Sequence, residues 1–447
     1  MKKRRLLYIS AICASLLLSS CGASGEATDA AIVPSNGGSF GADGGTFAAD
    51  EYSYAAEEEY AAVDDSVGEA EIGGLEVFEA GDKSGEKLVD ETKPYETFEI
   101  IEEYPRFNYQ AGLLTAGEWN DNENFDFWTN LITTRQDEWN SLPSHWNLST
   151  LNRVAVNVTN GDTPAENVTV KLYSGNTMVW EAVTDNNVNA YLFNTLSSSN
   201  QYVPTKITTE RGGQLLTEVE FSQGAYMDYV NIDVEAKKYG GDILDLMFVV
   251  DTTGSMGDEL AYLQAELQDI VKRVTDEKQI PVRLSVNFYR DSSDDYVVKD
   301  FDFTVDIDEA VRNLNQQYAS GGGDYEEAVE VALDVAINGS TWQEGNTKLM
   351  FLILDAPPHY NDNNAVQLAS LLETAAAQGI RIIPVASSGV DTETEFLCRT
   401  FAIATGGTYT FLTDHSGVGG SHLEPTVGQY QVEKLNDMIV RIIESYL

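Results

Sequence analysis

Three oxygen-bearing side chains stand at alternate positions directly after a short apolar run. The run covers residues 246–250, and Asp251, Thr253 and Ser255 follow it. At this spacing, one carboxylate and two hydroxyl groups can converge on one point of a short loop. Hard divalent cations bind oxygen atoms of these kinds, and Mg²⁺ takes about six of them at roughly 2.1 Å. The spacing therefore predicts a metal site, although such a loop also suits a plain turn that caps the next helix.

The hydrophobic pattern predicts the elements that hold this loop. The apolar run before it is typical of a buried strand, and after it apolar residues recur at the helix period over residues 260–274. The loop thus joins a strand to an amphipathic helix. In a sheet of parallel strands, ligands bind at the carboxyl ends of the strands, so the loop is expected at the edge where binding sites form.

The same segment resembles the beginning of a von Willebrand factor A domain. Members of that family carry Asp-x-Ser-x-Ser after the first strand, and Asp251-x-Thr253-x-Ser255 keeps both hydroxyls. The family also has an aspartate after a later strand, which Asp355 matches behind the apolar residues 348–354. The resemblance implies a metal-ion-dependent adhesion site that holds one Mg²⁺, Mn²⁺ or Ca²⁺ ion. One coordination position there stays open for a carboxylate of a protein partner.

A glycine loop between these two segments departs from the family pattern. It has the sequence Ser320-Gly-Gly-Gly-Asp324, with Gly323 or Asp324 where the family usually has a threonine. Glycine lets the backbone come close to a ligand, and Asp324 offers the missing oxygen atom. A third carboxylate makes the site more negative, which favours the cation but weakens its attraction for an acidic partner. We therefore include Asp324 among the expected metal ligands.

Two other functions fit the same residues. The segment Asp251-Thr-Thr-Gly-Ser255 is similar to the Asp-Lys-Thr-Gly-Thr loop of aspartyl-phosphate enzymes, in which the aspartate is the nucleophile and Mg²⁺ neutralises the phosphate. The chain lacks the lysine after Asp251 and a downstream Gly-Asp-Gly loop. A metal-independent scaffold of the cell envelope is the third possibility. The expectation is a binding protein and not an enzyme.

The composition excludes one class of partner. Among 447 residues, 72 are Asp or Glu and 27 are Lys or Arg, so the formal net charge is -45. Nucleic-acid binding requires a basic footprint, and no nucleic-acid partner is expected. The three cysteines, Cys13, Cys21 and Cys398, provide no disulfide framework. Cys398 is expected to be a small buried residue on a helix.

Residues 1–20 have the features of a lipoprotein signal peptide. Lys2-Lys-Arg-Arg5 precedes an apolar run over residues 6–18, and Leu18-Ser-Ser-Cys21 resembles a bacterial lipobox. The resemblance implies cleavage before Cys21 and its acylation, for example with palmitate. Each buried methylene contributes about 0.8 kcal/mol, so more than one chain gives lasting attachment. The expected location is the extracytoplasmic face of the bacterial cell envelope, with plain secretion as the alternative.

Four further regions are expected after the signal peptide. Residues 21–105 are acidic without apolar periodicity, which predicts a disordered linker. Residues 106–150 hold four of the six tryptophans and are expected to pack against a neighbouring domain rather than to bind carbohydrate. Residues 151–237 alternate in short stretches, which predicts an antiparallel β-sandwich that loosely resembles carboxypeptidase-regulatory-like modules. The fourth region, residues 238–447, carries the resemblance to the von Willebrand factor A domain.

Strands alternate with helices along residues 238–447, which predicts a doubly wound α/β fold around a parallel sheet. One of the expected helices covers residues 325–336, directly after the glycine loop. Asp291 and His359 follow predicted strand ends and are expected near the rim of the metal site. Because His359 comes after two prolines, we interpret it as a structural loop residue and not as a metal ligand.

Overall fold

The computed structural model describes residues 109–135, 138–187, 189–196, 202–221, 229–236, 240, 243–277 and 279–447. The expected signal peptide, the lipidation site at Cys21 and the expected linker over residues 21–105 lie outside the described residues. Within the described part of the chain, no helix combines the length and the apolar character that crossing a membrane requires.

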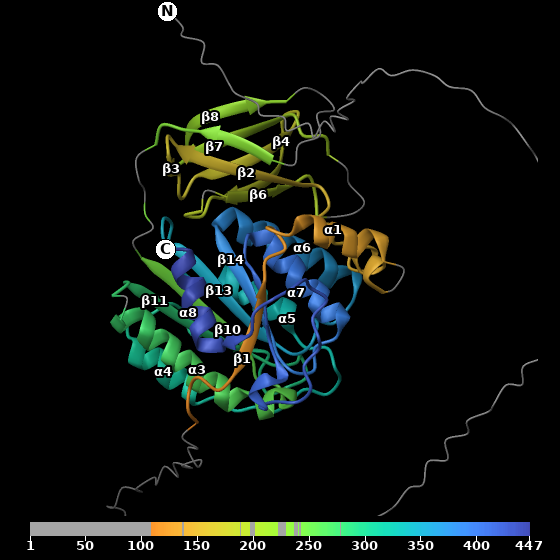
Figure 1. Cartoon of the computed structure of the whole chain (residues 1–447), viewed down its shortest axis with the longest axis vertical. Coiled ribbons are helices and arrows are strands. Elements are labelled where there is room, and N and C mark those ends of the chain that lie inside the picture. The colour runs from red at the N-terminus through yellow and green to blue at the C-terminus, as the bar shows by residue number, and fades with distance from the viewer. Residues whose placement is uncertain are drawn as a thin grey trace, which may run out of the picture. The chain divides into compact units, whose positions relative to one another are not determined.

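An eight-stranded mixed sheet forms the centre of the C-terminal region (Figure 1). Its five central strands are parallel, as predicted, whereas antiparallel pairs lie at both edges. In spatial order the strands are β12 (Val298–Lys299), β11 (Val282–Tyr289), β10 (Leu244–Asp251), β13 (Thr347–Leu354), β14 (Ile380–Ala386), β15 (Tyr409–Leu412), β1 (Thr115–Trp119) and β16 (Glu433–Lys434).

Helices cover both faces of this sheet, so the predicted doubly wound α/β fold is confirmed (Figure 1). In the central strand β10, Met247 and Val249 pack into one apolar cluster while Leu246 and Phe248 pack into the other. A strand buried on both faces is typical of parallel sheets. One face is covered by α3 (Leu260–Lys272), α4 (Ile307–Asn315) and α8 (Leu435–Ser445), and the other by α5 (Val329–Asp334), α6 (Asp362–Gln378) and α7 (Thr392–Thr405).

Helix α5 is shorter than the helix predicted over residues 325–336. The backbone N–H of Glu327 donates a hydrogen bond to the carbonyl of Pro357, 3.0 Å away, and residues 327 and 358 form an isolated parallel bridge. Because that N–H is used by a neighbouring loop, helix α5 begins only at Val329. The residues between Asp324 and the helix therefore belong to the loop that borders the site.

Strand β1 brings the N-terminal described segment into the sheet. It pairs with β15 and β16, whereas residues 106–150 were expected to pack against a neighbouring domain without adding a strand to its sheet. Just before β1, the backbone N–H groups of Gly112, Leu113 and Leu114 donate to the buried carboxylate of Glu266 on α3, at 2.8–3.1 Å. One side chain thus compensates three backbone donors, and this fixes the start of the strand.

The rest of the aromatic region packs on α7, as predicted. Helices α1 (Phe125–Thr134) and α2 (Leu142–His145) follow β1, and Trp128 and Trp146 are fully buried. Trp128 stacks on Phe396 of α7 with ring centroids 5.8 Å apart. Cys398 is a buried free thiol of the same helix, which confirms its predicted place.

A buried ion network joins this aromatic region to α7. The Arg399 guanidinium donates to both carboxylate oxygens of Asp121, at 2.7 and 2.8 Å, and to Glu395 at 3.0 Å. The three side chains are 1% exposed or less. Charged groups buried to this extent persist only when they are paired, so Asp121 is a structural partner of α7.

Residues 153–233 contain two four-stranded sheets that share one apolar core. Most pairs are antiparallel as predicted, but β9 runs parallel to β2. The first sheet comprises β3 (Thr163–Pro164), β2 (Arg153–Asn160), β6 (Asn189–Phe193) and β9 (Tyr229–Asp233), and the second comprises β5 (Thr177–Val183), β4 (Thr169–Ser174), β7 (Lys206–Arg211) and β8 (Gln214–Glu220).

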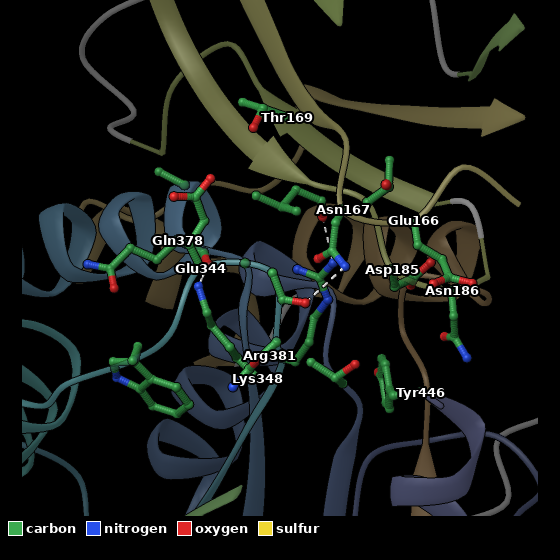
Figure 2. A pocket seen from close by; sticks show the side chains of 18 of the residues that line it. Glu166, Asn167, Thr169, Asp185, Asn186, Glu344, Lys348, Gln378, Arg381 and Tyr446 are labelled. Carbon is green, nitrogen blue, oxygen red and sulfur yellow. Dashed lines mark hydrogen bonds between the residues drawn. The ribbon is translucent and has the colours of Figure 1, made fainter. Parts of the chain in front are cut away.

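A polar cavity of about 380 Å³ lies where the small sheets meet the amino ends of β13 and β14 (Figure 2). Its cationic groups are already engaged by backbone carbonyls. Lys348 Nζ donates to Gln378 O at 2.7 Å, and Arg381 donates to Val183 O at 2.6 Å and Thr405 O at 3.1 Å. Among these bonds, only the one from Arg381 to Val183 O joins the small sheets to the large sheet; the other two lie within the C-terminal part.

Candidate metal centre

The loop after β10 gathers the three alternate side chains of the sequence motif. Asp251 and Thr253 are fully buried, and the Thr253 N–H and hydroxyl both donate to Asp251 Oδ1, at 2.8 and 2.7 Å. The hydroxyls of Thr253 and Ser255 lie 3.0 Å apart. Ser255 is exposed on a short 3₁₀ helix, Gly254–Asp258. The motif thus presents a buried carboxylate, a buried hydroxyl and an exposed hydroxyl in one row.

Asp355, at the end of β13, lies close enough to Asp251 for each charge to oppose the ionisation of the other. Burial, and then the charge of Asp355, raise the pKa of Asp251 above its usual range. Burial also raises the pKa of Asp355, although the nearby Ser255 hydroxyl opposes this rise. Asp251 Oδ2 and Asp355 Oδ1 are both buried, and neither oxygen has a hydrogen bond of ordinary distance and angle from a described residue. The buried Tyr289 hydroxyl lies near Asp251, but it too has no hydrogen bond of ordinary geometry with a described residue.

Backbone hydrogen bonds hold the loop after β10 against the glycine loop. Ser320 N–H donates to Thr252 O at 3.0 Å, and Gly254 N–H donates to Gly321 O at 3.2 Å. A Cβ on Gly254 would stand 3.0 Å from that carbonyl oxygen, and Gly321 has a φ of +85°. Glycine at both positions permits this approach. The loops are therefore held together by groups other than the carboxylates.

A cleft of about 430 Å³ opens over these loops. Ser255 and Asp355 line it, and so does Asp324, whose side chain is exposed. The structure thus brings Asp324 to the same opening as the predicted ligands. Its carboxylate oxygen also lies within 4.8 Å of ligand atoms of Asp291 and His359. Its role as a replacement for the family's threonine stays a prediction.

Glu327 is a residue of this site that sequence reasoning missed. It lines the same cleft, is 2% exposed, and receives no hydrogen bond at its buried Oε2 from any described residue. Burial, and then the charges of Asp251, Asp291 and Asp355, raise the pKa of Glu327 to about 9. One signal in the sequence is the pair of acidic residues after the glycine loop, but the pattern does not indicate which of the two turns inward.

His359 has a clear structural partner. Its Nε2 lies 2.7 Å from Asp291 Oδ1, and the Asp291 side chain is almost fully buried. Burial alone would lower the pKa of His359, but the hydrogen bond to Asp291 outweighs it and raises the pKa. Both residues lie beside Asp324, which lines the cleft, so the structure places them near the site.

A second histidine fixes the far wall of the cleft. His422 Nε2 lies 2.9 Å from the fully buried Glu259, and His422 Nδ1 lies 2.7 Å from Asp414. Both carboxylate oxygens of Glu259 also accept from Ser388 N–H, at 3.3 Å. These contacts anchor the loop after β15, whose residues 420 and 421 line the cleft.

The sequence model of the von Willebrand factor A domain family matches residues 245–419, which include the carboxylate-and-hydroxyl cluster. This part of the chain is therefore similar to a von Willebrand factor A domain. The match covers fewer than half of the 447 residues. It excludes strand β1, the two small sheets and helix α8.

The chain is also similar to one curated protein, an ariadne-like RING finger protein of Acanthamoeba polyphaga mimivirus. The two are 31% identical over 163 residues. This stretch is 32% of the present chain and only 16% of that protein's length. The likeness is therefore confined to a part of each chain.

Two solved structures from Bacteroides are similar in part. A conserved hypothetical protein BatB of Bacteroides thetaiotaomicron is 16% identical, with a TM-score of 0.32, and covers 45% of this chain and 98% of its own. An aerotolerance-related membrane protein of Bacteroides fragilis NCTC 9343, with multiple mutations to serines, is 14% identical, with a TM-score of 0.30 and the same two coverages. At these TM-scores, the family assignment depends on the sequence match alone.

Proposed function

We propose that the von Willebrand factor A domain binds one divalent cation and uses it to engage a carboxylate of a protein partner. The observation that carries this proposal is the pair of buried oxygens, Asp251 Oδ2 and Asp355 Oδ1, which have no hydrogen-bond donor among the described residues. Adjacent buried carboxylates are unfavourable unless a positive charge compensates them. The donor atoms beside them are oxygens, which suit a hard ion such as Mg²⁺, Mn²⁺ or Ca²⁺.

Asp251, Thr253, Ser255 and Asp355 would hold the cation directly or through water, and Asp324 would contribute from the mouth of the cleft. The Thr253 hydroxyl donates its hydrogen to Asp251 and accepts from Ser255, so one lone pair of its oxygen remains available to a cation. The bound ion supplies a positive charge with one position left for an acidic side chain of the partner. The exposed Ser255 and the open cleft leave room for such a side chain.

The burial of Asp251 supports a binding role over the phosphoenzyme alternative. A nucleophilic carboxylate must reach the phosphorus atom of its substrate. Asp251 is fully buried, and its Oδ1 already accepts two hydrogen bonds from Thr253. We therefore propose a non-catalytic function.

Calorimetric titration of the full chain with Mg²⁺ and Mn²⁺ tests the cation. We expect Asp251→Asn to abolish the binding, because the substitution removes a charged oxygen from the buried site. Asp276→Asn is the matched control, since it removes the same charge from an exposed residue outside the cleft. Equal binding by the Asp251→Asn variant and the unaltered chain would exclude the proposed site and favour a metal-independent scaffold.

The open coordination position is tested separately with Mn²⁺. An ion with an exchangeable water increases the relaxation rate of water protons, and a carboxylate that replaces this water reduces the effect. We expect a short glutamate-containing peptide to reduce the relaxation enhancement, and its glutamine counterpart to leave it unchanged. Equal effects of both peptides would contradict the proposed recognition of a carboxylate.

We further propose that Cys21 anchors the protein to the bacterial cell envelope, with the domain on the extracytoplasmic side. The support is the basic segment, the apolar run and the lipobox-like tetrapeptide of the sequence. Cys21→Ser is expected to move the chain from the membrane fraction to the soluble fraction and to prevent incorporation of labelled palmitate. Retention of both properties in the variant would exclude this anchor.

A further inference from the structure

A second group of metal-ligating side chains lies beside the proposed cation site. Asp291 follows β11, His359 follows β13, and Asp324 ends the glycine loop. One ligand atom from each residue lies within 4.8 Å of the others. Asp291 is 4% exposed, whereas Asp324 reaches the cleft. The group thus has one buried, one intermediate and one exposed member, which leaves it accessible from solvent.

Neighbouring groups that are not part of this triad fix its geometry. Asp294 Oδ2 accepts from Asp291 N–H at 3.1 Å and from Gly322 N–H at 2.8 Å. One carboxylate therefore holds two of the three loops. On the third loop, Asn364 Nδ2 donates to the backbone carbonyl of His359 at 2.8 Å. These bonds fix the backbone of the three loops that carry the side chains.

The buried carboxylate of Glu327, which lines the cleft of the first site, also borders the loop that carries Asp324. Its Oε1 lies 3.0 Å from the point where a Cβ on Gly322 would stand, so the carboxylate faces the glycine loop that carries Asp324. Its buried Oε2 has no hydrogen-bond donor among the described residues, and the same is true of Oε2 of the buried Glu330. Orphaned carboxylate oxygens are costly to bury, and a cation between these loops would compensate them.

We propose that Asp291, Asp324 and His359 hold a second divalent ion, of the Zn²⁺ or Mn²⁺ kind, with Glu327 between the two cation sites. A histidine nitrogen with carboxylate oxygens suits transition-metal ions, whereas an all-oxygen set suits Mg²⁺ or Ca²⁺. His359 Nε2 and Asp291 Oδ1 are now joined at 2.7 Å, and the ion takes the place of the proton between them. This site does not depend on occupation of the first site.

Zinc titration in millimolar Mg²⁺ tests the second site in the full chain, because Mg²⁺ saturates the all-oxygen site and weak surface carboxylates. The zinc affinity is measured by competition with a chromophoric chelator. We expect one zinc ion to bind, and His359→Gln to weaken its binding at least about tenfold. His415→Gln is the matched control, since His415 is exposed and belongs to no metal-ligating group among the described residues. Equal zinc affinity in the His359→Gln variant and the unaltered chain would overturn the proposal.

Two further measurements separate this site from the first. The Asp251→Asn variant is expected to lose Mg²⁺ binding and to keep zinc binding. If this variant instead loses zinc binding while the His359→Gln variant retains it, the zinc belongs to the first site and the proposal is overturned. X-ray absorption of the zinc-loaded unaltered chain needs no variant. An imidazole nitrogen in the coordination shell supports the site, whereas a shell of oxygen alone, or one with sulfur, overturns it.

Discussion

Glu327→Gln is expected to stabilise the cation-free protein, and to do so more strongly as the pH rises. The pKa of Glu327 is raised from 4.5 to about 9, first by burial and then by the charges of Asp251 and Asp291. A carboxyl group whose pKa is raised in the folded state keeps the protein most stable below pH 4.5, and this stability is lost as the pH rises toward 9. Glutamine does not ionise, so the stability of the variant does not fall with pH in this way.

The expected size follows from the proton that Glu327 takes up on folding. Each pKa unit corresponds to about 1.4 kcal/mol, and pH 7 lies about 2.5 units above the pKa of the unfolded chain. The variant should therefore gain roughly 3 kcal/mol in its free energy of unfolding at pH 7, and less than about 1 kcal/mol at pH 5. The side chain is 2% exposed but lines the open cleft, so these values are upper estimates that solvent in the cleft reduces.

Urea unfolding in the presence of a chelator, followed by tryptophan fluorescence at pH values from 5 to 8, measures this difference. Glu326→Gln removes the same charge from the neighbouring, partly exposed residue, and should change the free energy by less than about 0.5 kcal/mol. Saturating Mg²⁺ should reduce the effect of Glu327→Gln, because a cation beside Asp251 compensates the charge. A difference that does not vary with pH would refute the burial of an unpaired carboxyl at this position.

Two further predictions concern the groups that hold the domain around the site. Asp121→Ala should lower the free energy of unfolding by about 3–5 kcal/mol, because it removes one of the two carboxylates that pair with the buried Arg399 guanidinium. A loss below about 1 kcal/mol in urea unfolding would contradict this. Burial lowers the pKa of His422, but the hydrogen bonds to Glu259 and Asp414 outweigh it and raise the pKa above 6.5. His422→Gln should therefore destabilise the protein most below pH 6.5, with an effect that fades as the pH rises through the raised pKa; thermal unfolding that shows the opposite trend would exclude this role.

The sequence predicts the strand, loop and helix around Asp251 because each has a strong local signal. Strand β10 is an uninterrupted apolar run, and α3 has the helix period over its whole length. The order of Asp251, the glycine loop and Asp355 then follows from the alternation of strands and helices, since parallel strands direct their carboxyl ends to one edge. Local pattern and fold class together suffice for this part of the site.

Other features depend on contacts between distant residues that no local pattern encodes. Glu326 and Glu327 are chemically identical neighbours, but Glu327 is buried and its backbone is paired with the loop after β13, whereas Glu326 is partly exposed. Strand β1 is five residues long and pairs with a strand almost 300 positions away, so its apolar content alone does not identify its sheet. The inward carboxylate and the added strand therefore emerge only from the three-dimensional structure.

The two ends of β10 show why the unpaired oxygens point to function rather than to poor packing. Asp245 and Asp251 are both fully buried in the same strand. Asp245 accepts hydrogen bonds at both oxygens, from Arg283, Gln343 N–H and Asn346, at 2.8–3.0 Å. Asp251 has donors at one oxygen only. At the amino end of the strand, the fold thus supplies Asp245 with donors at both oxygens, including the cationic Arg283 side chain. At the carboxyl end, Asp251 lacks such donors at Oδ2, which favours a site that a bound cation completes.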